Sequence, residues 1–513
     1  MLTKVKTVAL DGMKGELVEI ETDISNGLPY FSVIGMADAS VREATERVKR
    51  ALINSGFQYP NGKITVNLSP AYIHKRGSHF DLGIAIGLLL SQEIIKSNIR
   101  NTLFIGELSL DGRILPVKGV LPMIMSVIEQ HNHTIEEIIL PKDNCLEAYL
   151  FTKMTKVKLF PAANLKEAAG HLMGRRLLAF EKELEYQKEE LLSDFADVKG
   201  HEDVKEAIMI AVAGKHNFLM MGAPGIGKTM LAKRIVGLLT PMSLKEQIET
   251  TKIYSYAGKL TSDIPMIYNR PFRHVTLGTT QVALMGGGNY PMPGEVSLAH
   301  NGVLFIDEML EFPESVIESL RVPIEDKEIH IVRKGNSVVF PSNFILVGAT
   351  NPCKCGFLGD DKRKCTCTQT EIDKYRGKLS GALVDRIDIA VEVSPIDYKH
   401  INCSEKNGYS TEKMIKIISR AEKIQKERYN GLPFDNNGDM GAQYIERFCK
   451  LDAAGRRFME SIYEKQHISM RRYHKILKIA RTIGDIKGKD TLTTEELATA
   501  FHYTRFLTEK ERR

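Results

Sequence analysis

Residues 222–229 read Gly222-Ala223-Pro224-Gly225-Ile226-Gly227-Lys228-Thr229, which matches the phosphate-loop pattern G-x-x-x-x-G-K-[ST] at every fixed position. Such glycines let the backbone turn so that its N–H groups face phosphate oxygens, and the following helix adds positive partial charge at its N-terminus. Lys228 is expected to reach the β- and γ-phosphates, and Thr229 to ligate Mg²⁺. Apolar residues 218–221 predict a short buried strand before the loop, and residues 230–236 predict an amphipathic helix after it. The stretch therefore predicts an ATP and Mg²⁺ site in an α/β domain.

The composition is that of a globular protein with several domains. The 513 residues suggest about three domains, and 43% hydrophobic with 26% charged residues fits neither a disordered nor a membrane protein. The longest apolar run, residues 82–90, is too short to cross a bilayer, and the first residues lack the layout of a signal peptide. A cytoplasmic protein without membrane contact is therefore expected. The net charge of +6 permits nucleic-acid binding through a local patch without requiring it.

Residues 1–170 alternate strand-like and helix-like segments and predict an α/β domain. The strand-like segments are 5–10, 17–21, 31–33 and 63–67, and a clear helical segment is 40–55. Within this domain, residues 104–117 and 138–141 resemble the proteolytic domain of Lon ATP-dependent proteases, whose chemistry needs a serine nucleophile activated by a lysine. The matching positions hold Asp81 and Leu121. We therefore expect a fold relative that lacks the dyad and is not a protease.

Two polar segments of this region are interpreted without a catalytic role. Ser78-His79-Phe80-Asp81 contains the residue types of a catalytic triad, but residues so close in sequence rarely converge in triad geometry. A polar loop that caps the helix from Leu82 is the preferred interpretation. Residues 171–193 are rich in Glu and Lys, with leucines at helical spacing, and predict a charged linker helix.

A second motif supplies the hydrolytic chemistry that a phosphate loop needs. Apolar residues 303–306 predict a buried parallel strand, and this strand ends in Asp307 and Glu308, the Walker B pattern. Asp307 is expected to hold Mg²⁺ through water. Glu308 is expected to orient and polarise the attacking water.

Further positions match those that AAA+ ATPases place around the nucleotide. Val198 and Gly200 precede a predicted helix just before the phosphate loop, where AAA+ proteins line the adenine pocket with backbone. Asn351 follows an apolar strand over 344–349 and stands at the sensor-1 position, where an amide can hydrogen-bond the γ-phosphate or the lytic water. Arg386 follows a short predicted helix and is the candidate finger for the nucleotide of a neighbouring subunit. An intrachain salt bridge is the alternative for that arginine.

Along its whole length the chain resembles one family, the magnesium-chelatase-like AAA+ proteins of the YifB/ComM type. The segments that carry the resemblance are 77–82 (GSHFDL), 293–300 (PGEVSLAH), 351–356 (NPCKCG) and 480–483 (ARTI). The resemblance implies an α/β fold with a P-loop AAA+ parallel-sheet core over 194–395. It also implies a Lon-protease-like α/β domain over 1–170 and a C-terminal α-helical lid over 396–513.

The same resemblance implies a role for an arginine of the lid. Arg471 lies in a Ser-x-Arg motif that opens a lid helix, at the sensor-2 position, which implies a cis contact with the γ-phosphate. Arg472 is the fallback. Relatives usually carry Pro-His-His after Pro-Phe-Arg, whereas residues 271–277 here read PFRHVTL, so a role for those histidines does not carry over.

Four of the seven cysteines form two C-x-C pairs within residues 353–367. They are Cys353, Cys355, Cys365 and Cys367. Four thiolates suit a closed tetrahedral site for a structural Zn²⁺ ion. The C-x-C spacing is tighter than the usual two-residue gap, so reduced thiols without metal stay open as the alternative.

A candidate nucleic-acid contact lies between the Walker B and sensor-1 segments. Residues 328–332 and 337–340 predict two strands joined through a basic tip that contains Arg333 and Lys334. A second insertion covers residues 270–295. In related hexameric helicases both insertions face the central pore, where Arg and Lys can grip phosphates without reading sequence. The alternative is an ordinary solvated turn.

The preferred function is an AAA+ ATPase that couples ATP hydrolysis in a ring to DNA translocation. The resemblance implies branch-migration helicase activity in recombination or natural transformation, a homo-hexameric ring, and single-stranded or branched DNA as partner. The alternative is the motor subunit of a metal-chelatase-like complex that acts on a protein partner; the Lon-like domain argues against it. A nucleotide-switched scaffold would need damaged hydrolytic residues, yet Glu308, Asn351 and Arg386 are all present.

Overall fold

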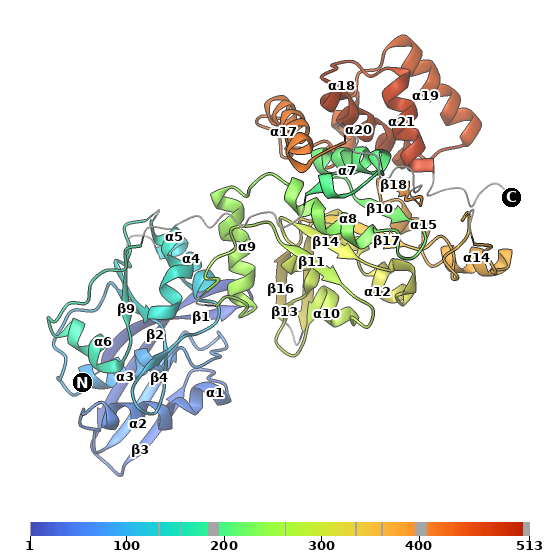
Figure 1. The fold of residues 1–513 in the computed structure, drawn as a ribbon. Coiled ribbons are helices and arrows are strands. Elements are labelled where there is room, and N and C mark those ends of the chain that lie inside the picture. Colours follow the sequence, from blue (N-terminus) through green and yellow to red (C-terminus); the bar gives the residue numbers. More distant parts are fainter. Residues whose placement is uncertain are drawn as a thin grey trace.

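The chain forms three successive parts (Figure 1). The computed structural model describes residues 2–131, 134–153, 155–182, 194–261, 263–333, 336–360, 363–395 and 408–505. We call residues 2–182 the N-domain, 194–395 the P-loop domain and 408–505 the lid. Among the described residues, no helix has the length and apolar character needed to span a membrane.

A mixed seven-stranded sheet forms the centre of the N-domain, in the order β3-β4-β2-β1-β5-β8-β9. Its strands are β1 (Thr3–Asp11), β2 (Lys14–Ser25), β3 (Tyr30–Ile34), β4 (Lys63–Ser69), β5 (Thr102–Phe104), β8 (Glu137–Pro141) and β9 (Lys158–Ala162). A small hairpin joins β6 (Glu107–Leu108) to β7 (Ile114–Leu115). The strands predicted from alternating hydrophobicity are therefore confirmed.

The central helix of the N-domain is α3 (Asp81–Ser91), which is buried along almost its whole length. Two glycines make this possible, because a Cβ atom at Gly83 or Gly87 would come within 2.6 or 2.5 Å of side chains on β2. The other helices are α1 (Ala39–Arg42), α2 (Ala44–Asn54), α4 (Val120–His131), α5 (Cys145–Lys153) and α6 (Leu165–Leu172). The helix predicted over 40–55 is thus two helices. Residues 175–182 are not helical, and the rest of the predicted linker helix, 183–193, lies outside the described residues.

The P-loop domain is built on a five-stranded sheet in the order β11-β14-β17-β10-β18, with every neighbouring pair parallel. Its strands are β10 (Phe218–Met221), β11 (Phe272–Val275), β14 (Val303–Ile306), β17 (Ile345–Thr350) and β18 (Ile389–Glu392). The central strands are apolar and buried on both faces, as expected for a covered parallel sheet. Parallel strands present their carboxyl ends at one edge of the sheet, and the phosphate loop, Asp307 and Asn351 all follow strands at that edge.

Helices and two hairpins surround this sheet. The helices are α7 (Glu202–Gly214), α8 (Lys228–Ile235), α9 (Leu244–Tyr256), α10 (Gln281–Met285), α11 (Glu295–Leu298), α12 (Glu314–Glu318), α13 (Arg321–Asp326), α14 (Gln369–Arg376) and α15 (Gly381–Val384). The hairpins are β12 (Gly286–Gly287) with β13 (Met292–Pro293), and β15 (Glu328–Arg333) with β16 (Asn336–Pro341). The predicted basic-tipped hairpin is therefore present as a hairpin.

The described residues of the lid, 408–505, are mainly helical and pack on α7 (Figure 1). Its helices are α17 (Thr411–Arg428), α18 (Ala442–Phe448), α19 (Ala453–Gln466), α20 (Met470–Lys487) and α21 (Thr494–Arg505). Buried Asp485 accepts hydrogen bonds from Arg428 at 2.5 and 2.9 Å and from Arg481 at 3.1 Å. The ARTI segment at 480–483 thus holds the lid together, because its arginine is buried in this charge cluster.

The N-domain docks on the P-loop domain through α4 and α5, which pack against α9. The N–H of Gly119 donates to the carbonyl of Ser255 at 3.0 Å. The two hairpins of the P-loop domain also contact the N-domain: Val338 lies against Gly12, and the Tyr290 ring lies 4.3 Å from the Arg76 guanidinium. The hairpins expected to face a pore therefore also touch the N-domain.

Candidate nucleotide-binding and hydrolysis site

The phosphate loop connects β10 to α8 as predicted. Gly225 and Gly227 adopt φ angles of 77° and 101°, which side chains rarely tolerate. A Cβ atom at Gly222 would lie 2.5 Å from the carbonyl oxygen of Val393, so that position also needs glycine. The backbone conformation of the loop thus requires glycine at these three positions. The loop leads into α8, whose first residue is Lys228.

Lys228 and Asn351 lie together at the carboxyl edge of the sheet. The Lys228 ammonium donates to the Asn351 Oδ1 atom at 3.0 Å and to the carbonyls of Gly222 and Ala223 at 2.5 and 3.0 Å. Burial lowers the pKa of Lys228, and the charges of Asp307 and Glu308 oppose that shift. The structure therefore brings the phosphate-loop lysine and the sensor-1 amide into direct contact.

The oxygen ligands expected for Mg²⁺ also meet. The Thr229 hydroxyl donates to Asp307 Oδ2 at 2.7 Å. A hydroxyl and a carboxylate side by side are the oxygen donors that Mg²⁺ prefers, so this pair fits the ion. Mg²⁺ bound there would neutralise phosphate charge.

Glu308 follows directly and is exposed, in the left-handed region at φ 49°. Its N–H donates to Asp307 Oδ1 at 3.0 Å, which ties the two acids into one turn. A non-glycine residue at positive φ costs about 1–3 kcal/mol and is typical of functional sites.

One neighbour of this site was not assigned from sequence. The His274 ring on β11 packs against the Phe305 ring in a tilted arrangement, with centroids 5.0 Å apart, and its Nε2 atom lies 4.0 Å from Asp307 Oδ2. Strand pairing explains the position, because His274 is opposite Phe305 in the ladder between β11 and β14. The sequence signal for this position is the segment PFRH at 271–274. That segment indicates a residue beside Asp307 only once β11 is known to pair with the Walker B strand β14.

Val198 and Gly200 lie in the segment 194–200, which begins the P-loop domain and contacts the lid through Thr411. Val198 is buried in the core, and Gly200 has a φ of 63°. The neighbouring Asp194 accepts from the Thr411 N–H of the lid at 2.7 Å, and its carbonyl accepts from Arg234 of α8 at 3.0 Å. The expected adenine-side residues therefore sit between the phosphate-loop helix and the lid.

Arg386 lies at the opposite edge of the sheet from the phosphate loop. Its carbonyl accepts from Asn217, the residue before β10, at 2.9 Å, and its guanidinium pairs with Glu325 of α13. A four-residue strand such as β10 separates this amino edge from the carboxyl edge by about 13 Å. Arg386 is therefore placed away from the phosphate loop of its own chain, and it also makes the intrachain salt bridge that was the alternative.

Arg471 shares the same partner. Its Nη2 atom lies 3.0 Å from Glu325 Oε1, and Ser469 of the Ser-x-Arg motif caps α20 by accepting from the Arg472 N–H. Arg472 lies over the Phe501 ring of the lid at 5.5 Å. The placement of Arg471 at the amino edge beside Arg386 does not fit the expected cis contact with the γ-phosphate, since its own phosphate loop is at the other edge. Glu325, which holds both arginines, had no signal in the sequence.

The four cysteines converge. Their sulfur atoms all lie within 4.8 Å of one another, with Cys353 Sγ 3.3 Å from Cys355 Sγ and 3.7 Å from Cys365 Sγ. A tetrahedral Zn²⁺ ion with Zn–S bonds of about 2.3 Å would require S···S separations of about 3.8 Å. Backbone N–H groups of Phe357 and Thr366 lower the pKa of Cys355 to about 5. The donor set therefore fits a structural zinc ion.

The residues at the two positions of the protease dyad, Asp81 and Leu121, make contacts that stabilise the fold. Asp81 is buried and accepts from Arg47 at 2.7 and 3.0 Å, and Leu121 is buried in the core. The Ser78 hydroxyl donates to Glu107, while the His79 ring contacts the Val8 carbonyl at 2.7 Å and burial lowers the pKa of His79 to about 4. These side chains thus have separate partners and do not form a triad.

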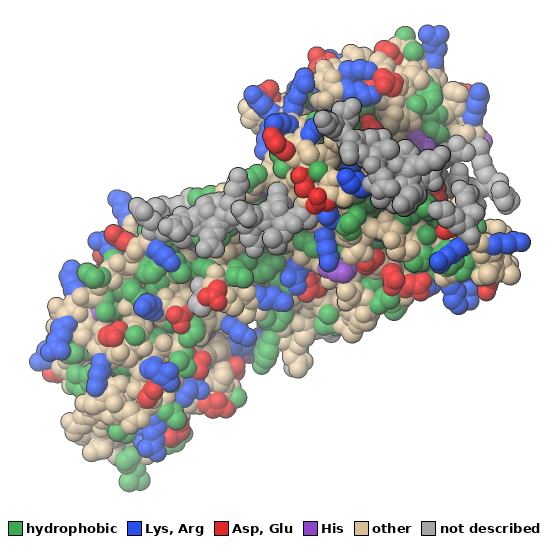
Figure 2. All heavy atoms as spheres, viewed as in Figure 1, with side chains coloured by type: hydrophobic (Ala, Val, Ile, Leu, Met, Phe, Trp, Pro, Cys, Tyr) green, Lys and Arg blue, Asp and Glu red, His purple; other side chains and the backbone are tan. Residues whose placement is uncertain are grey.

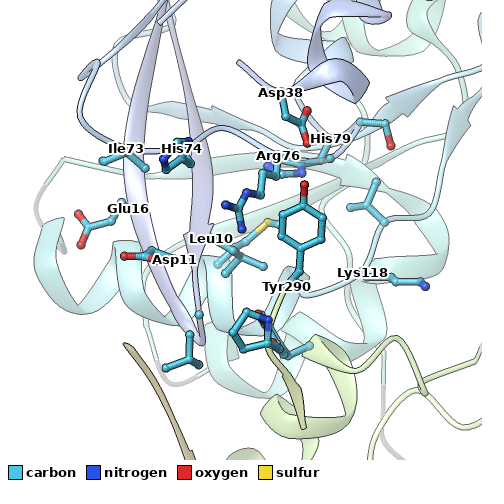
Figure 3. Close-up of a pocket in the computed structure, with 18 of the residues that line it drawn as sticks. Leu10, Asp11, Glu16, Asp38, Ile73, His74, Arg76, His79, Lys118 and Tyr290 are labelled. Atoms are coloured by element: carbon cyan, nitrogen blue, oxygen red, sulfur yellow. Dashed lines mark hydrogen bonds between the residues drawn. The ribbon is translucent and has the colours of Figure 1, made fainter. Parts of the chain in front are cut away.

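Beside this region is a cavity of about 650 Å³ between the N-domain and the hairpin β12–β13. Arg76, His74 and Lys118 line it together with Asp11, Glu16 and Asp38, and Tyr290 enters it from the P-loop domain (Figure 3). Its lining is of mixed charge. It belongs to the docking surface between the two domains.

The five-stranded parallel sheet, the phosphate loop and the acids and amide at its carboxyl edge define a P-loop ATPase of the AAA+ class. Three family models match the chain: "Magnesium chelatase, subunit ChlI" over residues 194–401, "Subunit ChlI of Mg-chelatase" over 20–144 and "Magnesium chelatase, subunit ChlI C-terminal" over 408–504.

Curated relatives extend the similarity over the whole chain. The chain is 37% identical to "Competence protein ComM" of Haemophilus influenzae, over 96% of this chain and 95% of that protein. It is 35% identical to the protein YifB of Escherichia coli (strain K12), over 98% of this chain and 97% of that protein. The similarity to the "Magnesium-chelatase 67 kDa subunit" of Heliobacterium mobile is 29% identity over 32% of this chain and 29% of that protein. The chain belongs to the YifB/ComM-type magnesium-chelatase-like family.

Proposed function

We propose that this ATPase works as a ring that couples ATP hydrolysis to DNA translocation, with branch migration during recombination or natural transformation as its reaction. The observation that carries the DNA part is the similarity, over nearly the full length of both chains, to a protein named for competence. The hydrolytic part rests on the contacts of Lys228 with Asn351 and of Thr229 with Asp307.

The proposed hydrolysis divides among residues of the carboxyl edge. Backbone N–H groups of residues 222–229 and the Lys228 ammonium hold the phosphates, while Thr229 and Asp307 hold Mg²⁺. Glu308 takes the water-activating role because its carboxylate is exposed next to Asp307. Asn351 orients the γ-phosphate or the water, since its amide already lies beside Lys228. Val198 and Gly200 supply backbone around adenine.

The ring part of the proposal follows from the amino edge of the sheet. Arg386 lies too far from its own phosphate loop to serve it, so we assign it to the nucleotide of a neighbouring subunit. Arg471 lies beside it on Glu325, and we assign it to the same neighbour rather than to its own chain. A heterologous contact of this kind can close into a ring, for which six subunits are expected.

DNA contact is assigned to the tip of the hairpin β15–β16. Arg333 ends β15, and Lys334 lies outside the described residues. Lys, Arg, Asp and Glu side chains are interspersed over the face of the molecule in Figure 2. Phosphate binding by a few basic residues in a ring is therefore favoured over binding to that broad face.

A structural Zn²⁺ ion is proposed for Cys353, Cys355, Cys365 and Cys367. The sulfur separations support it, and all four positions would be protein ligands, which gives a closed site without catalytic chemistry.

The second candidate is a chelatase-type motor subunit that acts on a protein partner. The descriptions of the three matching family models favour it. The two candidates differ in what should stimulate hydrolysis, which is DNA in the first and a protein partner in the second.

The deciding experiment measures ATP hydrolysis by the purified protein with and without single-stranded and branched DNA, across a salt series. We expect DNA to raise the rate and salt to weaken DNA binding. An unchanged rate together with no salt-dependent DNA binding would refute the DNA proposal. Glu308→Gln is expected to bind ATP but to lose at least about a hundredfold in turnover, typical of a lost general base. Rapid hydrolysis by that variant would refute the assigned role of Glu308.

A further inference from the structure

The loop that carries the four cysteines touches the phosphate loop. Gly356, directly after Cys355, has a φ of +84°, and a Cβ atom there would lie 2.6 and 2.8 Å from the Cδ and Cγ atoms of Pro224. The Gly356 N–H donates to the Cys353 carbonyl at 3.0 Å. The turn that positions two of the sulfurs therefore also positions the contact with Pro224.

The same loop is continuous with the sensor-1 residue. Asn351 and Cys353 are two residues apart, and Cys353 is fully buried. The Gly222 N–H donates to the Thr350 carbonyl at 3.2 Å. The Lys228 ammonium donates to Asn351 at 3.0 Å. The phosphate loop thus contacts the segment 350–356 at three of its own positions, which are Gly222 at its start, Pro224 and Lys228 near its end.

The far side of the cysteine loop is anchored as well. Helix α14 begins just after Cys367, with Thr368 as its N-cap. Arg376 at the end of α14 donates to the Pro352 carbonyl at 3.1 Å. The cysteines thus join the two ends of a loop, and Gly356, near the start of this loop, lies against Pro224.

We propose that the cysteine loop is a positioning element of the nucleotide site. Zn²⁺ held by the four sulfurs would fix Gly356 against Pro224 and so keep the phosphate loop and Asn351 in the geometry that binds ATP. This inference rests on the proposed function and assigns the metal a regulatory effect on nucleotide affinity. Coupling between two sites of this kind typically changes affinity about 5- to 150-fold.

The test compares two glycines of the same loop. Gly356→Ala introduces the clash with Pro224, whereas Gly359→Ala is the matched control. Gly359 also has a positive φ, +82°, but a Cβ atom there meets nothing closer than Glu392 Oε1 at 3.9 Å. Zinc content, thermal unfolding and equilibrium binding of a fluorescent ATP analogue are measured for both variants and for Cys365→Ser.

We expect Gly356→Ala to keep its zinc and its folded state but to raise the Kd of the analogue about tenfold, while Gly359→Ala changes it about twofold or less. Cys365→Ser is expected to lose zinc and to weaken binding similarly. Equal Kd changes in both glycine variants would overturn the inference, and so would normal binding by a folded, zinc-free Cys365→Ser protein.

If Gly356→Ala loses zinc, the variant Pro224→Ala tests the same contact from the side of the phosphate loop. This variant leaves the cysteine loop intact and removes the ring atoms that Gly356 contacts, so chelation of zinc should change its Kd clearly less than it changes that of the wild type. A response to chelation as large as that of the wild type would overturn the inference. Failure of the wild type itself to bind the analogue would refute the proposed function, and the inference with it.

Discussion

Glu147 is a carboxyl group buried between the N-domain and the P-loop domain. It is 6% exposed on α5, and it accepts hydrogen bonds from Ser255 of α9 and from Asn144, both at 2.5 Å. Burial raises the pKa of Glu147 from 4.5 to about 7, against the opposing effect of these hydrogen bonds. The folded protein therefore prefers the protonated acid more strongly than the unfolded chain does.

The sign and size of the pH effect follow from that shift. The stabilisation is fully present below the unfolded pKa of 4.5 and is lost as the pH rises through the folded pKa of about 7. At about 1.4 kcal/mol per pH unit the whole effect is about 3 kcal/mol. About 2 kcal/mol of it falls between pH 5.5 and pH 8. Glu147→Gln imitates the protonated acid and should abolish this dependence.

The assay is thermal unfolding of the wild type and Glu147→Gln at pH 5.5 and pH 8. We expect the melting temperature of Glu147→Gln minus that of the wild type to be larger at pH 8 than at pH 5.5. Glu129→Gln, at an exposed position on α4, is the control and should show no such change. A constant difference between wild type and Glu147→Gln at both pH values would refute the reasoning that the carboxyl is buried and protonated at the domain interface.

Three further predictions concern the site and the lid. An equal mixture of Arg386→Ala and Lys228→Ala proteins, each inactive alone, should recover up to about a quarter of wild-type ATPase activity if the arginine acts on a neighbour, and none if it acts in its own chain. Asp485→Asn should destabilise the lid by about 3 kcal/mol or more, because Arg428 and Arg481 would lose their buried counter-charge, and an unchanged melting temperature would contradict this. Asn351→Ala should lower kcat more than it raises the KM for ATP, as steady-state kinetics would show, and the reverse pattern would indicate a binding role.

The features that the sequence predicted well depend on local pattern. The phosphate loop needs glycine at positions where the chain turns, and the residues flanking it have strand and helix periodicity, so both its place and its conformation were predictable. Asp307 and Asn351 each follow a buried apolar strand. Since parallel strands end at one edge, their convergence followed from the fold class alone. The helical character of the lid was implied by the family resemblance, and long helices such as α17 and α20 are present there.

The features that the sequence did not predict depend on contacts between distant segments. Glu325 is separated from Arg386 by 61 residues and from Arg471 by 146, and nothing near it in sequence marks it as their partner. Glu147 and Ser255 come from different domains, so the burial of the carboxyl appears only when the domains dock. The family resemblance placed Arg471 beside its own nucleotide, whereas the packing of α20 places it at the other edge of the sheet.

The N-domain contacts the P-loop domain through α9, the next α-helix in the chain after the phosphate-loop helix α8. Lys228 opens α8, and α9 begins at Leu244 with Ser243 as its cap. Helix α9 then carries Ser255 to Glu147 and packs on α4 and α5. Residues 236–243, which include a short 3-10 turn, separate α8 from α9. The contacts of Val338 and Tyr290 with the N-domain reach the same domain from the two hairpins. The N-domain therefore contacts both α9, which follows the phosphate-loop helix in the chain, and the two hairpins of the P-loop domain.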